Sequence, residues 1–110
     1  MPKGAFVGEF ELYVLAAVLH AGEEAYGVSV RQEIERRTGR MVAIGAVHAT
    51  LGRLVDKGLV RFRVSEPQPI PGGKRRKFFR LTPAGARALR HSSAMLARML
   101  EGLAGLRGLE

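Results

Sequence analysis

The sequence has no cysteine and no apolar run long enough to cross a membrane. The first absence excludes disulfides and thiolate sites for metals or redox chemistry. The second argues against a membrane partner, because a spanning helix needs about 20 apolar residues. The longest apolar run, residues 12–19, follows two acidic residues and lacks the basic n-region of a secretion signal. We therefore expect a cytoplasmic protein.

The residues needed for common catalytic sites are also missing. The three histidines, at positions 20, 48 and 91, fall on separate predicted elements, and no cysteine can join them as a metal ligand. There is no phosphate-binding glycine loop, no nucleophile elbow and no pair of acids on an obvious cleft. The sequence predicts a protein that is not an enzyme and that binds no metal and no cofactor.

Positive charge is abundant and unevenly distributed. The net charge is +8, and residues 40–90 contain twelve Lys or Arg against two acids. The rest of the chain contains six Lys or Arg against eight acids. Such asymmetry is typical of a surface that meets a polyanion. Charge that only aids solubility is the alternative, and composition does not decide between the two.

Residues 44–57 form the most informative stretch. Val47, Leu51 and Leu54 recur at helical spacing, which predicts an amphipathic helix. The face opposite this stripe is unusual, because long charged residues usually occupy a solvent-facing helix and glycine costs about 1 kcal/mol there relative to alanine. The residues on or beside that face that have almost no side chain are Gly45, Ala46, Ala49 and Gly52. Small residues let another molecule approach the backbone, and DNA is our hypothesis for that molecule.

Two helices and a strand signal surround this stretch. Apolar spacing predicts helices over residues 9–19 and 26–38, with Gly39 as a C-cap. Residues 41–43 could form a very short strand. Residues 59–65 alternate apolar and polar side chains, which predicts a half-buried strand.

A basic hairpin tip and a long helix complete the predicted order. The loop 66–73 is rich in proline and glycine, and a return strand should occupy the second half of residues 74–81. Thr82 as N-cap and Pro83 at the first position open a helix that should run to about residue 106. Its apolar residues have the spacing of a coiled-coil seam. The seam consists of Leu89, Ser92, Leu96, Met99, Leu103 and Leu106.

This order predicts an α+β, mostly α, fold: a winged helix-turn-helix of three helices and a two-stranded wing. We divide it into a DNA-binding unit, residues 1–82, and a C-terminal dimerisation helix, residues 83–110, within one compact unit. Helix 44–57 would enter the major groove of double-stranded DNA, and the wing would contact the flanking backbone. The predicted DNA-binding residues are Gly45, His48, Ala49, Thr50, Arg53, Lys57, Lys74, Arg75, Arg76 and Lys77.

Several of these residues have a plainer interpretation. Arg53 could pair with Asp56 on a solvated face, His48 could fill space beside Val47, and the four cations could only keep a loop soluble. The small-residue face could instead pack on a protein helix, which would make the chain a winged-helix module for protein–protein interaction. We also predict a candidate effector pocket between the first and last helices. Its lining would be Phe10, Tyr13, Met95 and Met99, although a dimer core is the favoured interpretation of these residues, because amphipathic helices must bury such a stripe anyway.

At the level of motifs the chain resembles the PadR family of winged-helix transcriptional regulators. The resemblance begins with a leucine-rich first helix, followed by a Tyr-Gly start of the second. The central motif is G-x-(L/V)-x-x-x-L-x-x-L-x-x-x-G-L-(I/V), and the wing signature is (R/K)-(Y/F)-(Y/F)-x-L-T-x-x-G. The matching residues are Leu12, Leu15 and Leu19; Tyr26, Gly27 and Val30; Gly45, Val47, Leu51, Leu54, Gly58, Leu59 and Val60; and Gly72, Gly73 and Lys77 to Gly85.

The resemblance implies a homodimer that binds a twofold operator, usually as a repressor, with the C-terminal helix of each subunit packed on its partner. The single C-terminal helix resembles the short branch of the family. Two positions depart from the family pattern, because His48 stands where a tyrosine is usual and Ile44 where a proline is frequent. Both positions bear on DNA contact, so the family's operator preference does not carry over.

Overall fold

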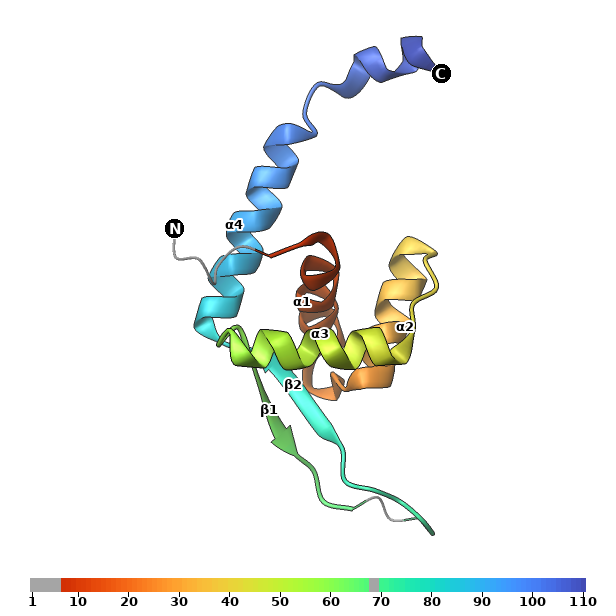
Figure 1. Ribbon diagram of the computed structural model, residues 1–110, viewed down its shortest axis with the longest axis vertical. Coiled ribbons are helices and arrows are strands. Elements are labelled where there is room, and N and C mark those ends of the chain that lie inside the picture. The colour runs from red at the N-terminus through yellow and green to blue at the C-terminus, as the bar shows by residue number, and fades with distance from the viewer. Residues whose placement is uncertain (1–6, 68–69) are drawn as a thin grey trace.

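The computed structural model describes residues 7–67 and 70–110 of the chain. Figure 1 shows a cluster of three helices from which a hairpin projects at one end and a further helix at the other. The elements are α1 (Glu9–Ala21), the 3₁₀ turn η2 (Gly22–Glu24), α2 (Gly27–Thr38), α3 (Ile44–Asp56), β1 (Val60–Val64), β2 (Lys77–Leu81), α4 (Pro83–Met99) and the 3₁₀ segment η3 (Leu103–Leu109). This order confirms the predicted mostly helical winged helix-turn-helix class.

Helix α1 lies at the centre of the cluster and packs on α2, α3, α4 and β2. Its side chains Val14 and Leu15 have no exposed surface. The apolar stripe of α3 meets them, and Val47, Leu51 and Leu54 are buried as its spacing predicts. Full burial of such a side chain contributes about 1.5–3 kcal/mol. The stripe therefore fixes which face of α3 points inward and leaves the opposite face in solvent.

On β1 the hairpin is buried only at its base. β1 and β2 pair antiparallel, with Val60 opposite Leu81 and Val64 opposite Lys77. Val60 is buried, whereas Phe62 is 43% and Val64 51% exposed. The expectation of a half-buried strand therefore holds only at Val60. The hairpin extends beyond the helices, as Figure 1 shows, so its outer half has no core to cover it.

The predicted short strand at residues 41–43 is wrong. That segment is an irregular connection, and the backbone N–H of Val42 donates to the Glu35 carboxylate at 3.2 Å. The free edge of β2 takes a different partner, because the N–H of Phe79 donates to the carbonyl of Ala25 at 2.7 Å. A residue just before α2 thus holds β2 by one backbone hydrogen bond, and periodicity over three residues could not reveal this.

The hairpin and α4 are joined at Thr82, which is the N-cap that the sequence predicts. Its hydroxyl accepts the N–H of Gly85 at 3.0 Å and donates to the carbonyl of Gly58 at 2.7 Å. Gly85 lies against the backbone of Leu59, and a Cβ at position 85 would fall 2.9 Å from the carbonyl carbon of Leu59 and closer still to its oxygen. Real Cβ atoms do not approach backbone so closely, so glycine is required at this joint.

The prediction that the last helix reaches residue 106 is wrong. Helix α4 ends at Met99, and the chain then turns through Gly102 at a φ of +69° before η3. Gly102, Gly105 and Gly108 recur at three-residue intervals. Each weakens an α-helix by about 1 kcal/mol relative to alanine, which outweighs the leucine spacing. Within the described residues, no helix combines the length and apolarity required to cross a bilayer.

Candidate nucleic-acid interface

The outward face of α3 is open, as its small residues suggest. Among the described residues, and apart from its chain neighbours and the helix's own backbone, a Cβ added at Gly45 or at Gly52 would meet no heavy atom within 4 Å. Ala46 and Ala49 on the same helix are exposed. Figure 1 shows α3 crossing the helical cluster with the hairpin leaving from below it. A partner could therefore approach the α3 backbone closely while also reaching the hairpin.

His48 is exposed, but its ring rests on the start of α2. A Cβ at Gly27 would lie 2.9 Å from the imidazole Nε2 and 3.2 Å from Nδ1. Gly27 therefore makes room for the ring, which is what sets the position of His48 beside the open face. The suggestion that His48 fills space beside Val47 misses this contact between helices.

Thr50 does not face outward, which corrects one predicted DNA contact. Its side chain is 1% exposed, and its hydroxyl accepts a hydrogen bond from Nη2 of Arg53 at 2.9 Å. The reason is its place at i+3 from Val47, on the flank of the buried stripe. Thr50 acts on Arg53 instead, by holding one end of a guanidinium whose side chain is 56% exposed.

A carboxylate from α1 holds the two cations of α3. Lys57 Nζ lies 3.0 and 2.9 Å from the two oxygens of Glu11, and Arg53 Nε lies 3.9 Å from one of them. Arg53 thus pairs with Glu11 rather than with Asp56. Partial burial raises the pKa of Glu11, but hydrogen bonds from Lys57 and the Gly8 N–H, with the charges of Lys57 and Arg53, outweigh it and hold the pKa below its ordinary value.

The wing cations are held differently. Arg76 stacks on the ring of Tyr26, with its guanidinium carbon 4.4 Å from the centroid, and Lys77 Nζ lies 4.5 Å from the centroid of Phe62. Lys74 and Arg75 are exposed towards the tip. An aromatic face attracts a cation without neutralising it. The wing therefore presents oriented positive charge.

Three more arginines lie on the hairpin outside the predicted site residues. Arg61 is paired with Arg80 across the strands, and Arg63 lies 4.6 Å from the centroid of Phe78. The alternation of residues 60–64 already places Arg61 and Arg63 on one face of β1, so the signal was present in the sequence.

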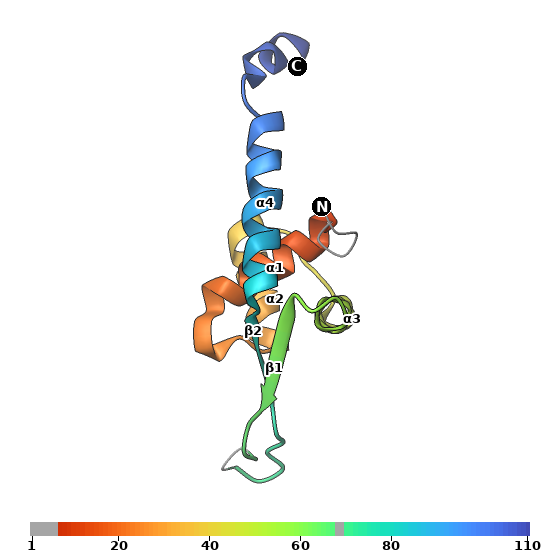
Figure 2. The same cartoon turned by 90° about the vertical axis from the view of Figure 1, so that its left-hand side faces the viewer.

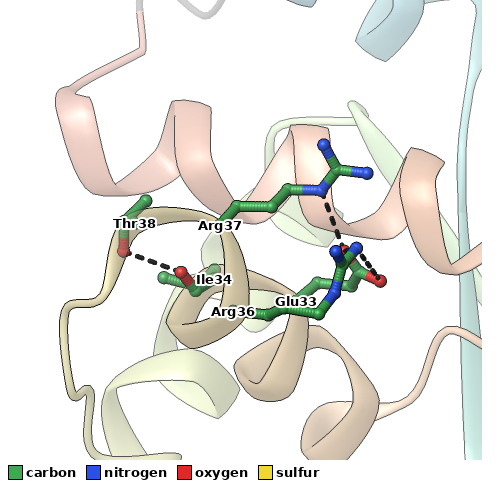
Figure 3. A network of polar contacts seen from close by, with 5 residues as sticks. All are labelled: Glu33, Ile34, Arg36, Arg37 and Thr38. Atoms are coloured by element: carbon green, nitrogen blue, oxygen red, sulfur yellow. Dashed lines mark hydrogen bonds and ion pairs between the residues drawn. The ribbon is translucent and has the colours of Figure 1, made fainter.

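Other cations are neutralised away from this surface. Figure 3 shows Glu33 on α2 accepting hydrogen bonds from Arg36 and Arg37, at 2.7 and 2.9 Å for the shortest contacts. The Arg37 hydrogen bond, with that of Arg36, keeps the pKa of Glu33 below its ordinary value. At the end of the same helix, the Thr38 hydroxyl donates to the carbonyl of Ile34 at 2.7 Å. This helix contributes ion pairs within itself rather than free charge.

The predicted dimer residues divide between two segments. Leu89 and Ser92 are half-buried on α4, whereas Leu96 and Met99 are 48% and 77% exposed. Leu103 and Leu106, beyond the turn at Gly102, are 50% and 53% exposed in η3. Figure 2 shows α4 extending away from the helical cluster, so in the single chain its outer half has little to pack against.

The residues of the candidate effector pocket do not line the cavity that the structure describes. Phe10 and Tyr13 are half-buried on α1, and Met95 and Met99 are exposed on α4. The cavity lies instead between the end of α1 and the hairpin. Over residues 7–67 and 70–110 there is also no cluster of three or more His, Asp or Glu that could hold a metal ion.

Known proteins with similar sequences and folds give this geometry a context. The model of the transcriptional regulator PadR-like family matches residues 14–91. The transcriptional regulator Rv3488 of Mycobacterium tuberculosis is 36% identical over 90 residues, which is 80% of this chain and 79% of that protein. A PadR family transcription regulator from Clostridium difficile R20291 has a similar fold, with a TM-score of 0.72 at 20% identity over 90% of this chain and 98% of the other. PadR from Bacillus subtilis, solved in complex with operator DNA, has a TM-score of 0.63 at 21% identity over 74% of this chain and 45% of that chain.

Proposed function

The chain belongs to the PadR-like family of transcriptional regulators, and we propose that it acts as a homodimeric repressor on a twofold operator. As a member of this family it is a DNA-binding winged-helix regulator and not an enzyme. In the proposed complex the two α3 helices enter major grooves one helical turn apart, and the wings lie on the flanking backbone. Repression follows if the bound dimer covers sequence that the transcription machinery needs. Such a role places the protein in the cytoplasm, with the chromosome.

The observation that carries this proposal is the open face of α3 beside an oriented basic wing. In the part of the chain that the structure describes, no other element comes within 4 Å of a Cβ at Gly45 or Gly52, so a groove wall can approach the helix backbone. Most sequence-independent affinity comes from cations that contact phosphates. We assign that role to the residues of the wing, which are Lys74, Arg75, Arg76 and Lys77.

Base reading falls to few side chains. Arg53 has the long hydrogen-bond-donating side chain nearest the open face, and its guanidinium can donate two hydrogen bonds to the O6 and N7 of guanine. His48 and Lys57 flank it, and Gly45 and Ala49 permit the approach. Thr50 is buried and has no part in contact. With so few polar side chains, we propose that DNA shape and deformability supply part of the specificity.

The experiment that tests DNA binding uses random-sequence duplex over a series of salt concentrations. The parent is compared with a variant in which Lys74, Arg75, Arg76 and Lys77 are all replaced by Ala. We expect the slope of log K against log salt to fall by about three to four units for each bound subunit, because each phosphate contact contributes about 0.9. A control with the same loss of charge elsewhere has Arg36, Arg37, Arg90 and Arg107 replaced by Ala. Equal slopes in the two variants would contradict the proposed wing contacts.

The dimer is proposed from the apolar surface that α4 leaves exposed. Leu96 and Met99 lie on its outer half, and a second copy of α4 is the natural cover for such a stripe. Replacing both residues with Asp should halve the mass measured by light scattering and weaken operator binding, while circular dichroism stays helical. The control is the same double change at Arg87 and Arg90, which lie on α4 outside the predicted seam. A variant that keeps the parent mass would remove this interface.

A further inference from the structure

A cavity of about 550 Å³ lies between the C-terminal end of α1 and the hairpin. Its volume falls within the roughly 300–1,000 Å³ of small-molecule sites. One wall contains Leu19 and Glu23, and the opposite wall contains Arg61, Arg63 and Arg80. Two separate parts of the fold, the helical cluster and the wing, therefore share this space.

The charge on these walls is unbalanced. Arg61 stands directly opposite Arg80 in the ladder, an arrangement in which like charges destabilise a strand pair. Among the described residues, no carboxylate lies within ion-pair distance of Arg61, Arg63 or Arg80. Glu23 is the acid in the lining, so the three arginines leave two positive charges without compensation. A dianion would compensate them.

The lining is also ordered and partly apolar. Arg63 stacks on Phe78, whose ring meets that of Tyr26 edge-on at 5.8 Å between centroids. A guanidinium held in this way loses less freedom when it binds an oxyanion. Leu19, which is 60% exposed, and Val18 add apolar surface on the helical side. The lining suits a molecule with an anionic group and an apolar or planar body.

The cavity does not belong to the proposed DNA surface. In Figure 2, α3 lies on one side of the hairpin, and the orange segment that ends α1 lies on the other. Duplex that lies along α3 would leave the cavity uncovered. We propose that it is a binding site for a small organic dianion, of which a phosphate monoester with a planar body is the simplest form. A molecule bound there would touch both the helical cluster and the wing.

The test uses 1-naphthyl phosphate as the probe, with isothermal calorimetry for affinity and amide chemical shifts for location. Inorganic phosphate and 1-naphthol separate the anionic and apolar parts. We expect 1-naphthyl phosphate to bind more tightly than either, with shifts at Gly22, Glu23 and the β2 residues. The double variant Arg61→Gln and Arg80→Gln should lose at least about tenfold in affinity, because hydrogen bonds to charged groups are strong. The control Arg36→Gln and Arg90→Gln should bind as the parent does.

Four results would overturn the proposal. The first two are no binding of the probe by the parent and equal affinity in the two double variants. The third is that the probe changes amide shifts only in α3 or at Lys74 and Arg75. The fourth is that random-sequence duplex displaces the probe and itself changes the amide shift of Glu23. The last result would assign the cavity to DNA. All variants are first compared by their amide spectra, and because the calorimetry needs no DNA, a failure of operator binding leaves this test intact.

Discussion

The cations of α3 and those of the wing are held by opposite chemistry. On α3, Lys57 and Arg53 share the carboxylate of Glu11, which removes one of their two charges. On the wing, Arg76 and Lys77 lie over aromatic rings, which orient a cation and leave its charge intact. The two regions carry similar residues, yet they present different fields to a polyanion.

The difference teaches what each region can contribute to DNA binding. The wing should supply affinity that does not depend on sequence and falls steeply with salt. Helix α3 presents a triad with a net charge of only +1 beside an open, small-residue face, so more of its contribution should come from fit and from a few hydrogen bonds. Glu11 competes with DNA phosphate for Lys57, which should weaken contacts at sites where the fit is poor.

The largest expected effect comes from matched double variants. Arg76→Ala with Lys77→Ala should lower the salt slope on random-sequence duplex by about two units for each bound subunit, since each phosphate contact contributes about 0.9. Arg53→Ala with Lys57→Ala removes the same charge but should lower it by about half as much, because Glu11 already holds those cations. Fluorescence anisotropy at several salt concentrations measures both slopes. Equal losses would show that Glu11 does not restrain the cations of α3.

A smaller effect should follow from Glu11→Gln. This change releases Lys57 and Arg53 while keeping the side-chain shape. Affinity for random-sequence duplex should rise a few-fold at low salt, with a slope steeper by about one unit. The gain should be smaller on a fitted operator, so the ratio of operator to random affinity should fall. Glu24→Gln is the control and should change neither ratio nor slope, because among the described residues the exposed Glu24 forms no ion pair.

The same carboxylate should make stability depend on pH. The pKa of Glu11 in the folded protein lies below its ordinary value of 4.5. Its contribution to the free energy of unfolding is therefore present above the unfolded pKa and is lost as pH falls through the folded pKa. Near pH 7, the free energy of unfolding measured with urea should be higher for the parent than for Glu11→Gln by up to about 1 kcal/mol. That gap should close as pH falls through the pKa of Glu11 in the folded protein, and a gap that does not vary with pH would assign the effect to packing.

The smallest effect is expected from the rings beneath the wing cations. Tyr26→Leu keeps every charge but removes the surface on which Arg76 stacks. An exposed cation–π contact is worth about 0.5–1 kcal/mol, so random-duplex affinity should fall by about two- to fivefold with no change in salt slope. Tyr13→Leu, a ring on α1 with no such contact to the wing, is the comparison. A change of slope in Tyr26→Leu would mean that the ring alters the number of phosphate contacts.

Much of the fold could be predicted because its signals are local and strong. The stripe of Val47, Leu51 and Leu54 fixed the inward face of α3, and Thr82 with Pro83 marked the start of α4. The end of α4 was predicted wrongly because leucine spacing was weighted above three glycines. The contact of Ala25 with the edge of β2 was missed because a single backbone hydrogen bond leaves no pattern in sequence.

The candidate site was less predictable because its chemistry depends on contacts between distant segments. Sequence could place Arg53 on α3 but could not bring Glu11, 42 residues earlier, to within 3.9 Å of it. Nor could it show that Thr50 turns inward or that His48 rests on Gly27. The small-residue face of α3 could be predicted from residue types alone, since the lack of long side chains there does not depend on contacts with distant segments.

The contact of Gly85 with the Leu59 backbone fixes the angle at which α4 leaves the helical cluster. The helix has 17 residues, so at 1.5 Å each it is about 25 Å long. A tilt of about 10° at its base would swing the far end by about 4 Å, slightly more than the rise of one base pair. If the far ends meet in a dimer, a displacement of that size would change the separation of the two α3 helices. They would then no longer match the spacing of successive major grooves. The absence of a side chain at Gly85 would then determine how well the spacing of the two α3 helices matches that of the two operator half-sites.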